Sequence, residues 1–489
     1  MLHEEEKCIA ERIRKDKSEE FARKYPHHHQ TFFNRPHWTR RRFFQVAGAS
    51  LAGSYLARRA SASAPAPVIT SQGMTTKNTA KNCIFILLTG AISVVDTFDL
   101  KVTNGVTPSN FNPTTVKGIN WPMGLLPKLG QQLPNIAIVH SMSAWALVHS
   151  LAQTWSQIGR NPAAALGNIA PNIGSVVAIE RDPQRTPSQV FPTFVALNSP
   201  SGAGEGYFQA TYAPFRVNES GGTTSSGIPD TTNPNGQTTF NTMYSRLHQY
   251  DDGLRINSPY GQPLDDYNAF YLAAQGMMYN STVQQAFGFA SADSMRYGSS
   301  SFGNACLAAK QILAANQGTR FIQISYGSWD MHQDIYGLQN PKGNNMYTMS
   351  PALDNGVSAL LGDLQSSGLL NETLVVMVGE FGRTPGISAA GGRDHYLVQS
   401  AVFAGAGVKG GRAIGTTSAD GSTVTDYGWN GSGTTGPRLV RPEDIESTIY
   451  SAMGIDWTTI RYDDPFHRGF EYVPFASQGS YGPINELWG

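Results

Sequence analysis

The side chains of this chain that could do chemistry stand directly behind apolar runs. The run "LVVMV" leads into "GEFGRTPGISAAGGRDHY", residues 379–396, a glycine-dense stretch that contains Glu380, Arg383, Asp394 and His395. A second group, Asp330 and His332, follows the run "RFIQIS". Carboxylates and neutral imidazoles are the ligands that zinc and similar divalent metals take in proteins. The two groups together predict a metal site.

Polar residues also follow two further apolar runs. Ser93, Asp96 and Asp99 come after "CIFILLTG", and the stretch after "NIAIV" contains His149 and Ser150. Ligands of parallel α/β sheets bind beyond the carboxyl ends of the strands, so four strand ends would bring carboxylates, imidazoles and hydroxyls to one edge. The glycines of the late loop would let the backbone fold tightly around such a polar site.

A pair of metal ions at this site would suit the transfer of a phosphoryl or sulfuryl group. Two ions about 4 Å apart clamp such a group for in-line displacement. The guanidinium of Arg383 would hold the anion through a bidentate contact. Simpler interpretations stay open: Asp and Gly form turns on their own, Glu380 and Arg383 could pair, and Asp96 with Asp99 could cap a helix.

The elements that must position these residues alternate between strands and helices. Apolar runs predict strands within residues 83–88, 135–143, 190–198, 319–327, 373–379 and 398–411. Helical patterns cover residues 150–158, 173–181, 303–318 and 350–368, the last with Ser350 as its N-cap. This alternation predicts an α/β fold with a mostly parallel central sheet and helices on both faces.

Residues 200–300 differ from the rest of the chain. They are rich in Gly, Ser, Thr and Asn, with one helical segment at about residues 258–280. Such a composition predicts an insertion or a flexible cap over the core.

The N-terminal segment resembles an export signal. From Thr39 the sequence "TRRRFFQVAGASLAGSYLARRASASAPAP" has an arginine pair, a short apolar run and small residues, with cleavage expected near Ala62 or Ala64. We expect residues 1–64 to be a twin-arginine signal peptide with a long n-region and residues 65–489 to form the exported domain, with the insertion or cap at about residues 200–300. The apolar run is too short for a stable membrane span. The twin-arginine translocase would then carry the protein, already folded, to the periplasm or outside the cell.

The composition excludes some classes of partner. The 489 residues include 36 basic and 36 acidic side chains, so no basic excess points to nucleic acid. The three cysteines are Cys8, Cys83 and Cys306, without zinc-type spacing; the last two stand in apolar stretches as buried small residues.

Several motifs resemble one protein family. "GEFGRTP", "GGRDHY" and "AGAGVKGGRAIGTT", with "DTFDLK" and "WDMH", are similar to those of a large family of uncharacterised, twin-arginine-exported bacterial proteins. That family is sulfatase-like and belongs to the alkaline phosphatase superfamily, and the resemblance spans about residues 81–470. It implies an alkaline phosphatase-like three-layer sandwich with a site for one or two divalent metals. Zinc is the expected ion, with calcium or manganese as alternatives.

The resemblance also implies roles for individual residues. Asp330 with His332 would bind one ion, and Asp394 with His395 the other. Asp96 would be the carboxylate of the first strand, and His467 is a candidate by elimination, as the last histidine of the chain.

A second implied set is catalytic. The nucleophile would be Ser150 or His149 at a helix N-terminus, with Ser141 and Ser143 as further possibilities. His149 could instead be a further ligand. Arg383 and Glu380 complete this set.

These observations lead to two hypotheses. The first is an exported metal-dependent hydrolase of phosphate or sulfate esters, with a small molecule or a glycan as the ester substrate. Formylglycine chemistry is excluded, because no Cys or Ser stands in the C/S-x-P/A-x-R context at the start of the helix near residue 149. The alternative is a catalytically inactive surface or binding protein on the same fold. Asp96 favours the alternative, because it lies farther from its strand than the resemblance implies.

Overall fold

The computed structural model describes residues 69–489, apart from 166, 224–234, 256–272, 434–435 and 465–467. The predicted signal peptide, most of the helical segment at 258–280, and His467 therefore lie outside the described residues.

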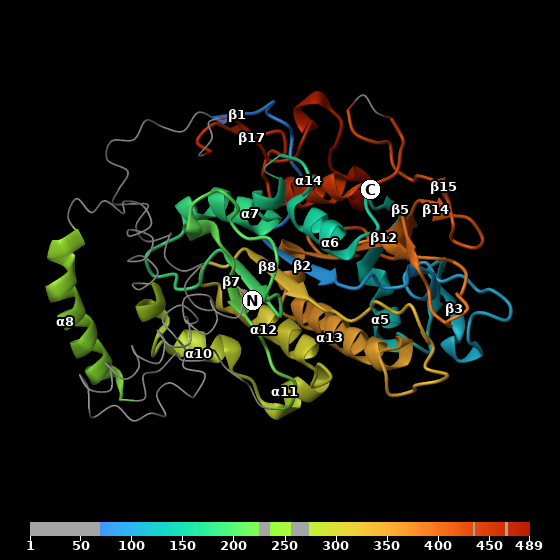
Figure 1. Ribbon diagram of the computed structural model, residues 1–489, viewed down its shortest axis with the longest axis horizontal. Coiled ribbons are helices and arrows are strands. Elements are labelled where there is room, and N and C mark those ends of the chain that lie inside the picture. The colour runs from blue at the N-terminus through green and yellow to red at the C-terminus, as the bar shows by residue number, and fades with distance from the viewer. Residues whose placement is uncertain (1–68, 166, 224–234, 256–272, 434–435, 465–467) are drawn as a thin grey trace, which may run out of the picture. The chain divides into compact units, whose positions relative to one another are not determined.

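The core of the fold is an eight-stranded sheet with the strand order β13-β5-β12-β9-β2-β8-β6-β7 (Figure 1). Its strands are β2 (Asn82–Leu88), β5 (Ile136–Ser143), β6 (Phe194–Leu197), β7 (Phe215–Val217), β8 (Phe321–Ser325), β9 (Thr373–Gly379), β12 (Val398–Ala404) and β13 (Arg412–Ile414). Only β12 runs antiparallel to its neighbours, β5 and β9. The sheet is therefore mostly parallel, which confirms the predicted sheet type.

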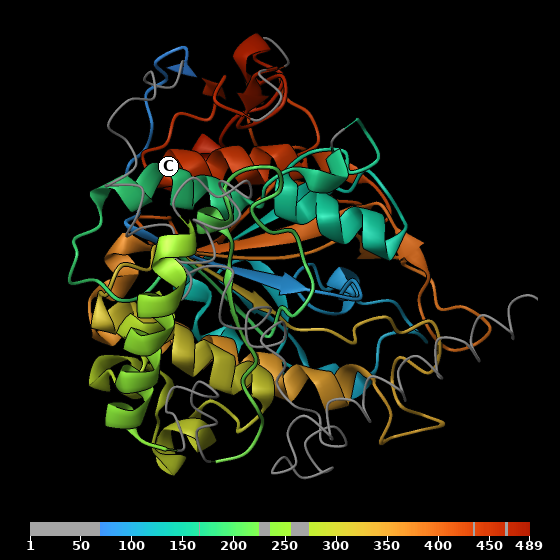
Figure 2. The same cartoon turned by 60° about the vertical axis from the view of Figure 1, so that its left-hand side comes forward.

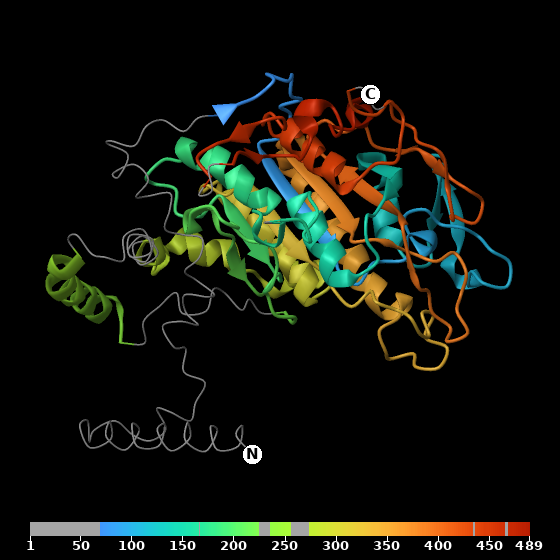
Figure 3. The same ribbon diagram turned by 45° about the horizontal axis from the view of Figure 1, so that its top comes forward.

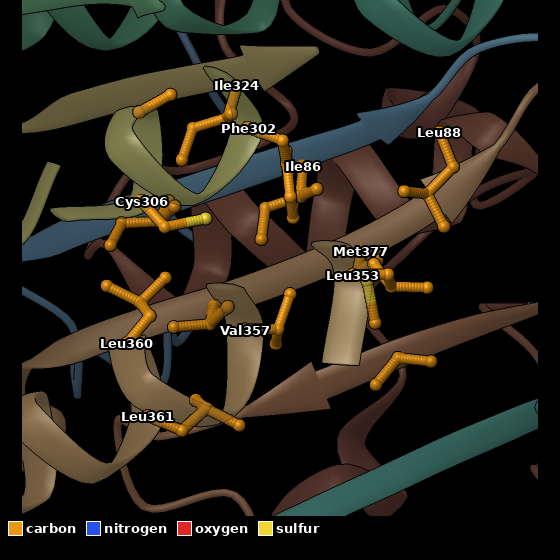
Figure 4. Close-up of a cluster of buried hydrophobic side chains, with 14 of the residues drawn as sticks. Ile86, Leu88, Phe302, Cys306, Ile324, Leu353, Val357, Leu360, Leu361 and Met377 are labelled. Atoms are coloured by element: carbon orange, nitrogen blue, oxygen red, sulfur yellow. The ribbon is translucent and has the colours of Figure 1, made fainter. Parts of the chain in front are cut away.

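Helices cover both faces of the sheet (Figures 1 and 3). The side chains of β2 alternate between two apolar clusters, as the two-residue period of a strand requires. One cluster, drawn in Figure 4, holds Ile86 and Leu88 with α12 (Ser301–Ala315) and α13 (Met346–Ser366). The other holds Phe85 and Leu87 with α7 (Ile173–Arg181) and α14 (Pro442–Ala452). The fold is therefore the predicted α/β sandwich, with the sheet as its middle layer.

Further elements surround this core (Figure 2). They are α5 (Pro127–Gln131), α6 (His149–Ile158), α8 (Gln237–Arg255), α10 (Ser281–Phe287), α11 (Ser291–Arg296), β1 (Ile69–Thr70), β3 (Pro113–Val116), β4 (Ile119–Pro122), β10 (Gly382–Arg383), β11 (His395–Tyr396), β14 (Thr416–Thr417), β15 (Val424–Asp426), β16 (Ile460–Arg461) and β17 (Phe470–Glu471). The strand β7 lies within residues 200–300 and pairs with β6, so part of this segment belongs to the central sheet. In the described part of the chain, no helix is long and apolar enough to cross a membrane.

The start of α13 differs from the prediction. The helix begins at Met346, and its N-cap is Asn345, whose side chain accepts hydrogen bonds from the backbone N–H of Tyr347 and of Thr348. The hydroxyl of Thr348 accepts in return from the N–H of Asn345, which completes a capping box. Ser350, the predicted cap, is buried inside the helix.

Replacing Asn345 is expected to weaken α13. The change Asn345→Ala removes the acceptor of two backbone N–H groups and is expected to lower the free energy of unfolding by about 1 kcal/mol. The control is Ser350→Ala, because the buried Ser350 hydroxyl has no hydrogen-bond partner among the described residues. Denaturant unfolding measures both. A larger loss for Ser350→Ala than for Asn345→Ala would contradict this assignment of the cap.

A buried carboxyl on α14 makes stability depend on pH. Glu446 is 1% exposed, accepts a hydrogen bond from Tyr450, and burial raises its pKa from 4.5 to about 8. Between these values the folded protein keeps a proton that the unfolded chain has released. The free energy of unfolding therefore falls as the pH rises from about 4.5 to about 8, by up to about 1.4 kcal/mol per pH unit.

The variant Glu446→Gln isolates this effect. We expect the difference in unfolding free energy between variant and wild type to grow in the variant's favour as the pH rises through this range. Denaturant unfolding at pH 5, 6, 7 and 8 measures it. A difference that does not change with pH would show that Glu446 is ionised in the folded protein.

Candidate metal centre

Four side chains from three segments meet beyond the carboxyl ends of the strands. His149, Asp330, His332 and His395 each offer one ligand atom, and these atoms all lie within 4.8 Å of one another. His149 is the first residue of α6, Asp330 and His332 lie in the loop that follows β8, and His395 begins β11. Asp330 is exposed, so the group is open to solvent on its side.

Glycines allow the two ligand loops to touch. The N–H of Arg393 donates to the carbonyl of Met331 at 3.0 Å, which joins the late loop to the loop after β8. A Cβ on Gly392 would stand 2.0 Å from the carbonyl carbon of His332. Gly90, with φ +93°, lies against the backbone of Asp330, where a Cβ would stand 2.6 Å from the amide nitrogen. The glycines of this region therefore serve close backbone contact, as the sequence predicts.

Each of the three imidazoles is oriented through its Nδ1 atom. Nδ1 of His395 lies 2.7 Å from the carbonyl of Leu147, an acceptor with no proton of its own, so this nitrogen donates. In the same way Nδ1 of His149 lies 2.7 Å from Oε1 of Glu380, and Nδ1 of His332 lies 2.8 Å from Oδ1 of Asp394. Such partners are typical of histidines that bind metals through Nε2, because they fix the tautomer and the ring orientation.

The Nε2 lone pairs consequently point at one another and at Asp330. Nε2 of His332 lies 2.9 Å from Nε2 of His395 and 3.1 Å from Oδ1 of Asp330. Nε2 of His149 is buried, has no hydrogen-bond partner among the described residues, and lies 3.2 Å from the same oxygen. Neighbouring ligands of a tetrahedral zinc ion stand about 3.3 Å apart. The four residues therefore fit a divalent metal in chemistry and in spacing.

Arg383 is buried beneath this group and holds Asp330. Its guanidinium donates to Asp330 Oδ1 at 2.5 Å, and to the backbone carbonyls of Gly90, Ala91 and Arg393 at 2.6, 3.0 and 3.0 Å. The remaining N–H faces Nε2 of His332 at 3.4 Å. All five N–H groups thus have protein partners, which leaves none for a substrate anion. In the structure Arg383 positions the ligands and does not fill the predicted anion-binding role.

The site shifts the pKa values of its members in opposite directions. The hydrogen bond to Glu380 raises the pKa of His149, although burial opposes it. Burial lowers the pKa of His395, assisted by the positive charge of Arg383. Burial would raise the pKa of Asp330, but the hydrogen bond and charge of Arg383 outweigh it and lower this pKa. Asp330 therefore stays ionised at neutral pH, as a metal ligand must.

The structure brings together only some of the predicted site residues. Asp330, His332 and His395 meet as predicted, and His149 joins them. Asp394 stands behind His332 as the acceptor of its Nδ1 proton, and Glu380 does the same for His149. Ser150 follows His149 in the first turn of α6 and is exposed.

Asp96 belongs to a buried ion pair instead of the four-residue group. Arg393 donates to both of its oxygens, at 2.7 and 2.9 Å, and the hydroxyls of Ser93 and Tyr336 donate to it at 2.6 and 2.8 Å. These four hydrogen bonds occupy the carboxylate, so the structure gives Asp96 a structural role where the sequence suggested a ligand.

Two parts of the site were not anticipated. The ring of Phe381 packs against those of His149 and His395, with centroid distances of 4.8 and 4.4 Å. The place of Phe381 within "GEFGR" is a signal that could have indicated it. The carbonyl of Leu147, which orients His395, carries no signal in the sequence.

The fold and the site define an α/β protein with a candidate metal centre at the carboxyl edge of its sheet. Residues 80–468 match the family described as "Protein of unknown function (DUF1501)". The chain therefore belongs to this family. Comparison with curated proteins gives no match.

Solved structures similar to the chain include sulfatases and a protein in the alkaline phosphatase superfamily. One is the PsFucS1 sulfatase from Pseudoalteromonas sp., at 11% identity over 85% of this chain and 71% of that chain, with a TM-score of 0.37. Another is a protein in the alkaline phosphatase superfamily from Vibrio parahaemolyticus, at 10% identity over 79% and 70%, with a TM-score of 0.35. A third is the putative sulfatase yidJ from Bacteroides fragilis, at 10% identity over 84% and 81%, with a TM-score of 0.36.

Glu380 tests whether the Nδ1 contacts support metal binding. The change Glu380→Gln keeps the shape but removes the charge that orients His149, so we expect the affinity for zinc to fall about 10- to 100-fold. Competition with a chelator, read by mass spectrometry, measures it. The control is Glu372→Gln, because Glu372 lies before β9, at the other end of that strand. An unchanged affinity in Glu380→Gln would contradict the proposed role of this contact.

Proposed function

We propose that the protein is a metal-dependent hydrolase of phosphate or sulfate esters. The observation that carries the proposal is the convergence of three imidazole Nε2 atoms and one carboxylate oxygen on one point, with every Nδ1 already engaged. Two unprotonated nitrogens 2.9 Å apart repel each other unless a cation or a proton stands between them. A purely structural group would have no need of this arrangement. The family resemblance of the motifs supports the same class of reaction.

The residues of the chain have separate tasks in this proposal. His149, Asp330, His332 and His395 would hold a single divalent ion, with zinc as the expected metal. A bound metal would supply a Lewis acid that polarises the ester oxygen. Arg383 keeps Asp330 ionised and directed at the centre. The exposed hydroxyl of Ser150 stands at the N-terminus of α6, where free backbone N–H groups favour an anion, and is the proposed nucleophile.

The proposal extends to substrate and location. The substrate would be a small-molecule or glycan ester, since Asp330 and Ser150 are both exposed and give such a molecule access. Export by the twin-arginine translocase to the periplasm or beyond stays a prediction from residues 1–64. That route suits a protein whose metal is loaded before export.

One observation favours the alternative of an inactive binding protein. Arg383 places a permanent cation 2.5 Å from Oδ1 of Asp330 and 3.4 Å from Nε2 of His332. In a protein without metal, this guanidinium would balance the charge of Asp330 and keep the loops in place. The metal content of the natively produced protein separates the two functions.

Removal of one ligand tests the enzyme. We expect wild-type protein to contain about one equivalent of a divalent metal and to hydrolyse 4-nitrophenyl phosphate or 4-nitrophenyl sulfate. His395→Ala is expected to lose the metal and to reduce kcat/KM by more than about 100-fold, beyond the range for residues that only support ligands. His248→Ala on α8 is the matched control and is expected to change neither quantity.

Ser150→Ala separates the nucleophile from the metal. We expect this variant to keep its metal content while losing hydrolysis. Full activity in Ser150→Ala would remove the serine from the mechanism and leave the metal centre standing. If the wild-type protein contains no metal, and circular dichroism shows that His395→Ala is equally well folded, the hydrolase is excluded and the binding protein is favoured.

A further inference from the structure

A cavity of about 410 Å³ lies at the amino ends of the strands, opposite the candidate metal centre. Three residues of its lining stand directly before strands of the central sheet. Lys81 precedes β2, Arg320 precedes β8 and Glu372 precedes β9. The seven residues of β2 separate the two edges by roughly 20 Å, at about 3.3 Å per residue. The cavity is therefore a separate place in the molecule.

Positive charge predominates in the wall of this cavity. Its basic side chains are Lys81, Arg181, Arg185 and Arg320. The lining has one acid, Glu372, whose Oε1 lies 3.7 Å from Nζ of Lys81. Asp182 stands next to Arg185 and accepts a hydrogen bond from the hydroxyl of Thr193; burial raises its pKa to about 6, so at neutral pH it is largely ionised and offsets part of the charge of Arg185. The lining itself has four basic side chains and one acid.

Acidic neighbours offset part of this charge. Burial lowers the pKa of Arg320; the negative charge of Glu372 opposes this effect, and the positive charge of Arg181 adds to it. Burial likewise lowers the pKa of Arg185; the charge of Asp182 opposes this effect, and that of Arg320 adds to it. Like charges that are partly buried are unfavourable unless enough opposite charge is nearby. An anion bound in the cavity would therefore stabilise its basic side chains.

Hydrogen bonds to the protein anchor the three arginines. Arg181 donates to the carbonyl of Met453 and to Oε1 of Gln184, Arg185 donates to the carbonyls of Gln189 and Phe191, and Arg320 donates from NH1 to the carbonyl of Thr319 at 2.8 Å and to Oδ1 of Asn316 at 3.3 Å. Within the described part of the chain, no hydrogen bond engages Nε or NH2 of Arg320. The hydroxyl of Thr79, in the same wall, is buried without a partner there. Nε and NH2 of Arg320 and the hydroxyl of Thr79 thus remain as donors for a ligand.

We propose that this cavity binds a tetrahedral oxyanion, phosphate or sulfate, either free or as a group on a larger molecule. Guanidinium groups match such oxyanions with paired, charge-assisted hydrogen bonds, and anchored side chains are already arranged for them. The excess of basic over acidic side chains in the lining favours an anion. The proposal does not depend on the activity of the metal centre.

The test measures binding of inorganic phosphate and inorganic sulfate to the intact protein by isothermal titration calorimetry in an anion-poor buffer. We expect binding to wild-type protein, with Arg181→Gln and Arg320→Gln each weakening it by about tenfold or more, as expected for loss of a hydrogen bond to a charged group. Arg246→Gln, at an exposed position of α8, is the matched control and is expected to bind like wild type. Arg320→Lys, which keeps the charge, is expected to retain part of the affinity, and circular dichroism confirms that each variant is folded.

The metal centre could itself bind these anions, so His395→Ala is titrated as well. Binding that survives in His395→Ala and weakens in Arg320→Gln supports the cavity. Binding that disappears in His395→Ala and is unchanged in both arginine variants overturns the proposal, as does the absence of any binding. A second titration uses glucose 6-sulfate and glucose 6-phosphate in the His395→Ala protein. If the sugar esters bind much more tightly than the inorganic ions, and Arg320→Gln removes this binding, the site takes a group on a larger molecule. If the sugar esters and the inorganic ions bind with equal affinity, the site takes the free ion.

Discussion

The candidate centre depends on the close approach of two loops. Gly392 lies against the carbonyl of His332, and Gly90 lies against the amide of Asp330, at separations that leave no space for a side chain. Without these contacts, the loop after β8 and the strand β11 could not present Asp330, His332 and His395 to one point. Arg383 then ties the same segments together from beneath, through the carbonyls of Gly90, Ala91 and Arg393. The close contact between the two backbones therefore determines where the four side chains of the candidate centre lie.

Most of the fold could be predicted because its strands are buried on both faces. Such strands are continuous apolar runs, and "CIFILL" and "TLVVMVG" became β2 and β9 within a residue or two. The direction of β12 could not be predicted, because an apolar run shows burial and gives no information about strand orientation. The cap of α13 was misplaced because Ser350 and Asn345 are both good N-cap residues, and only the structure shows that Ser350 is already inside the helix.

The candidate site was predictable in its ligands and less so in their partners. Asp and His residues behind buried strands indicated the edge of the sheet at which the four side chains meet, and three of these four were predicted as metal ligands. Asp96 was misjudged because its partner Arg393 is almost 300 residues away in the chain, and a sequence pattern does not reveal such an ion pair. The partners of the five N–H donors of Arg383 could likewise not be predicted from the sequence. A charged residue in a conspicuous motif is equally compatible with holding a substrate and with holding the backbone.

The position of β2 in the sheet has a consequence for synthesis of the chain. This strand is made early, yet its two neighbours are β8 and β9, whose residues are added more than 200 positions later. At about 5 to 20 residues per second, the ribosome needs roughly 10 to 50 s to deliver the first of them. During that time an uncharged apolar strand has both edges unpaired, which is the condition under which nascent chains aggregate. We therefore expect the growing polypeptide to need a chaperone, or temporary cover from its own early segments, until the middle of the sheet is complete.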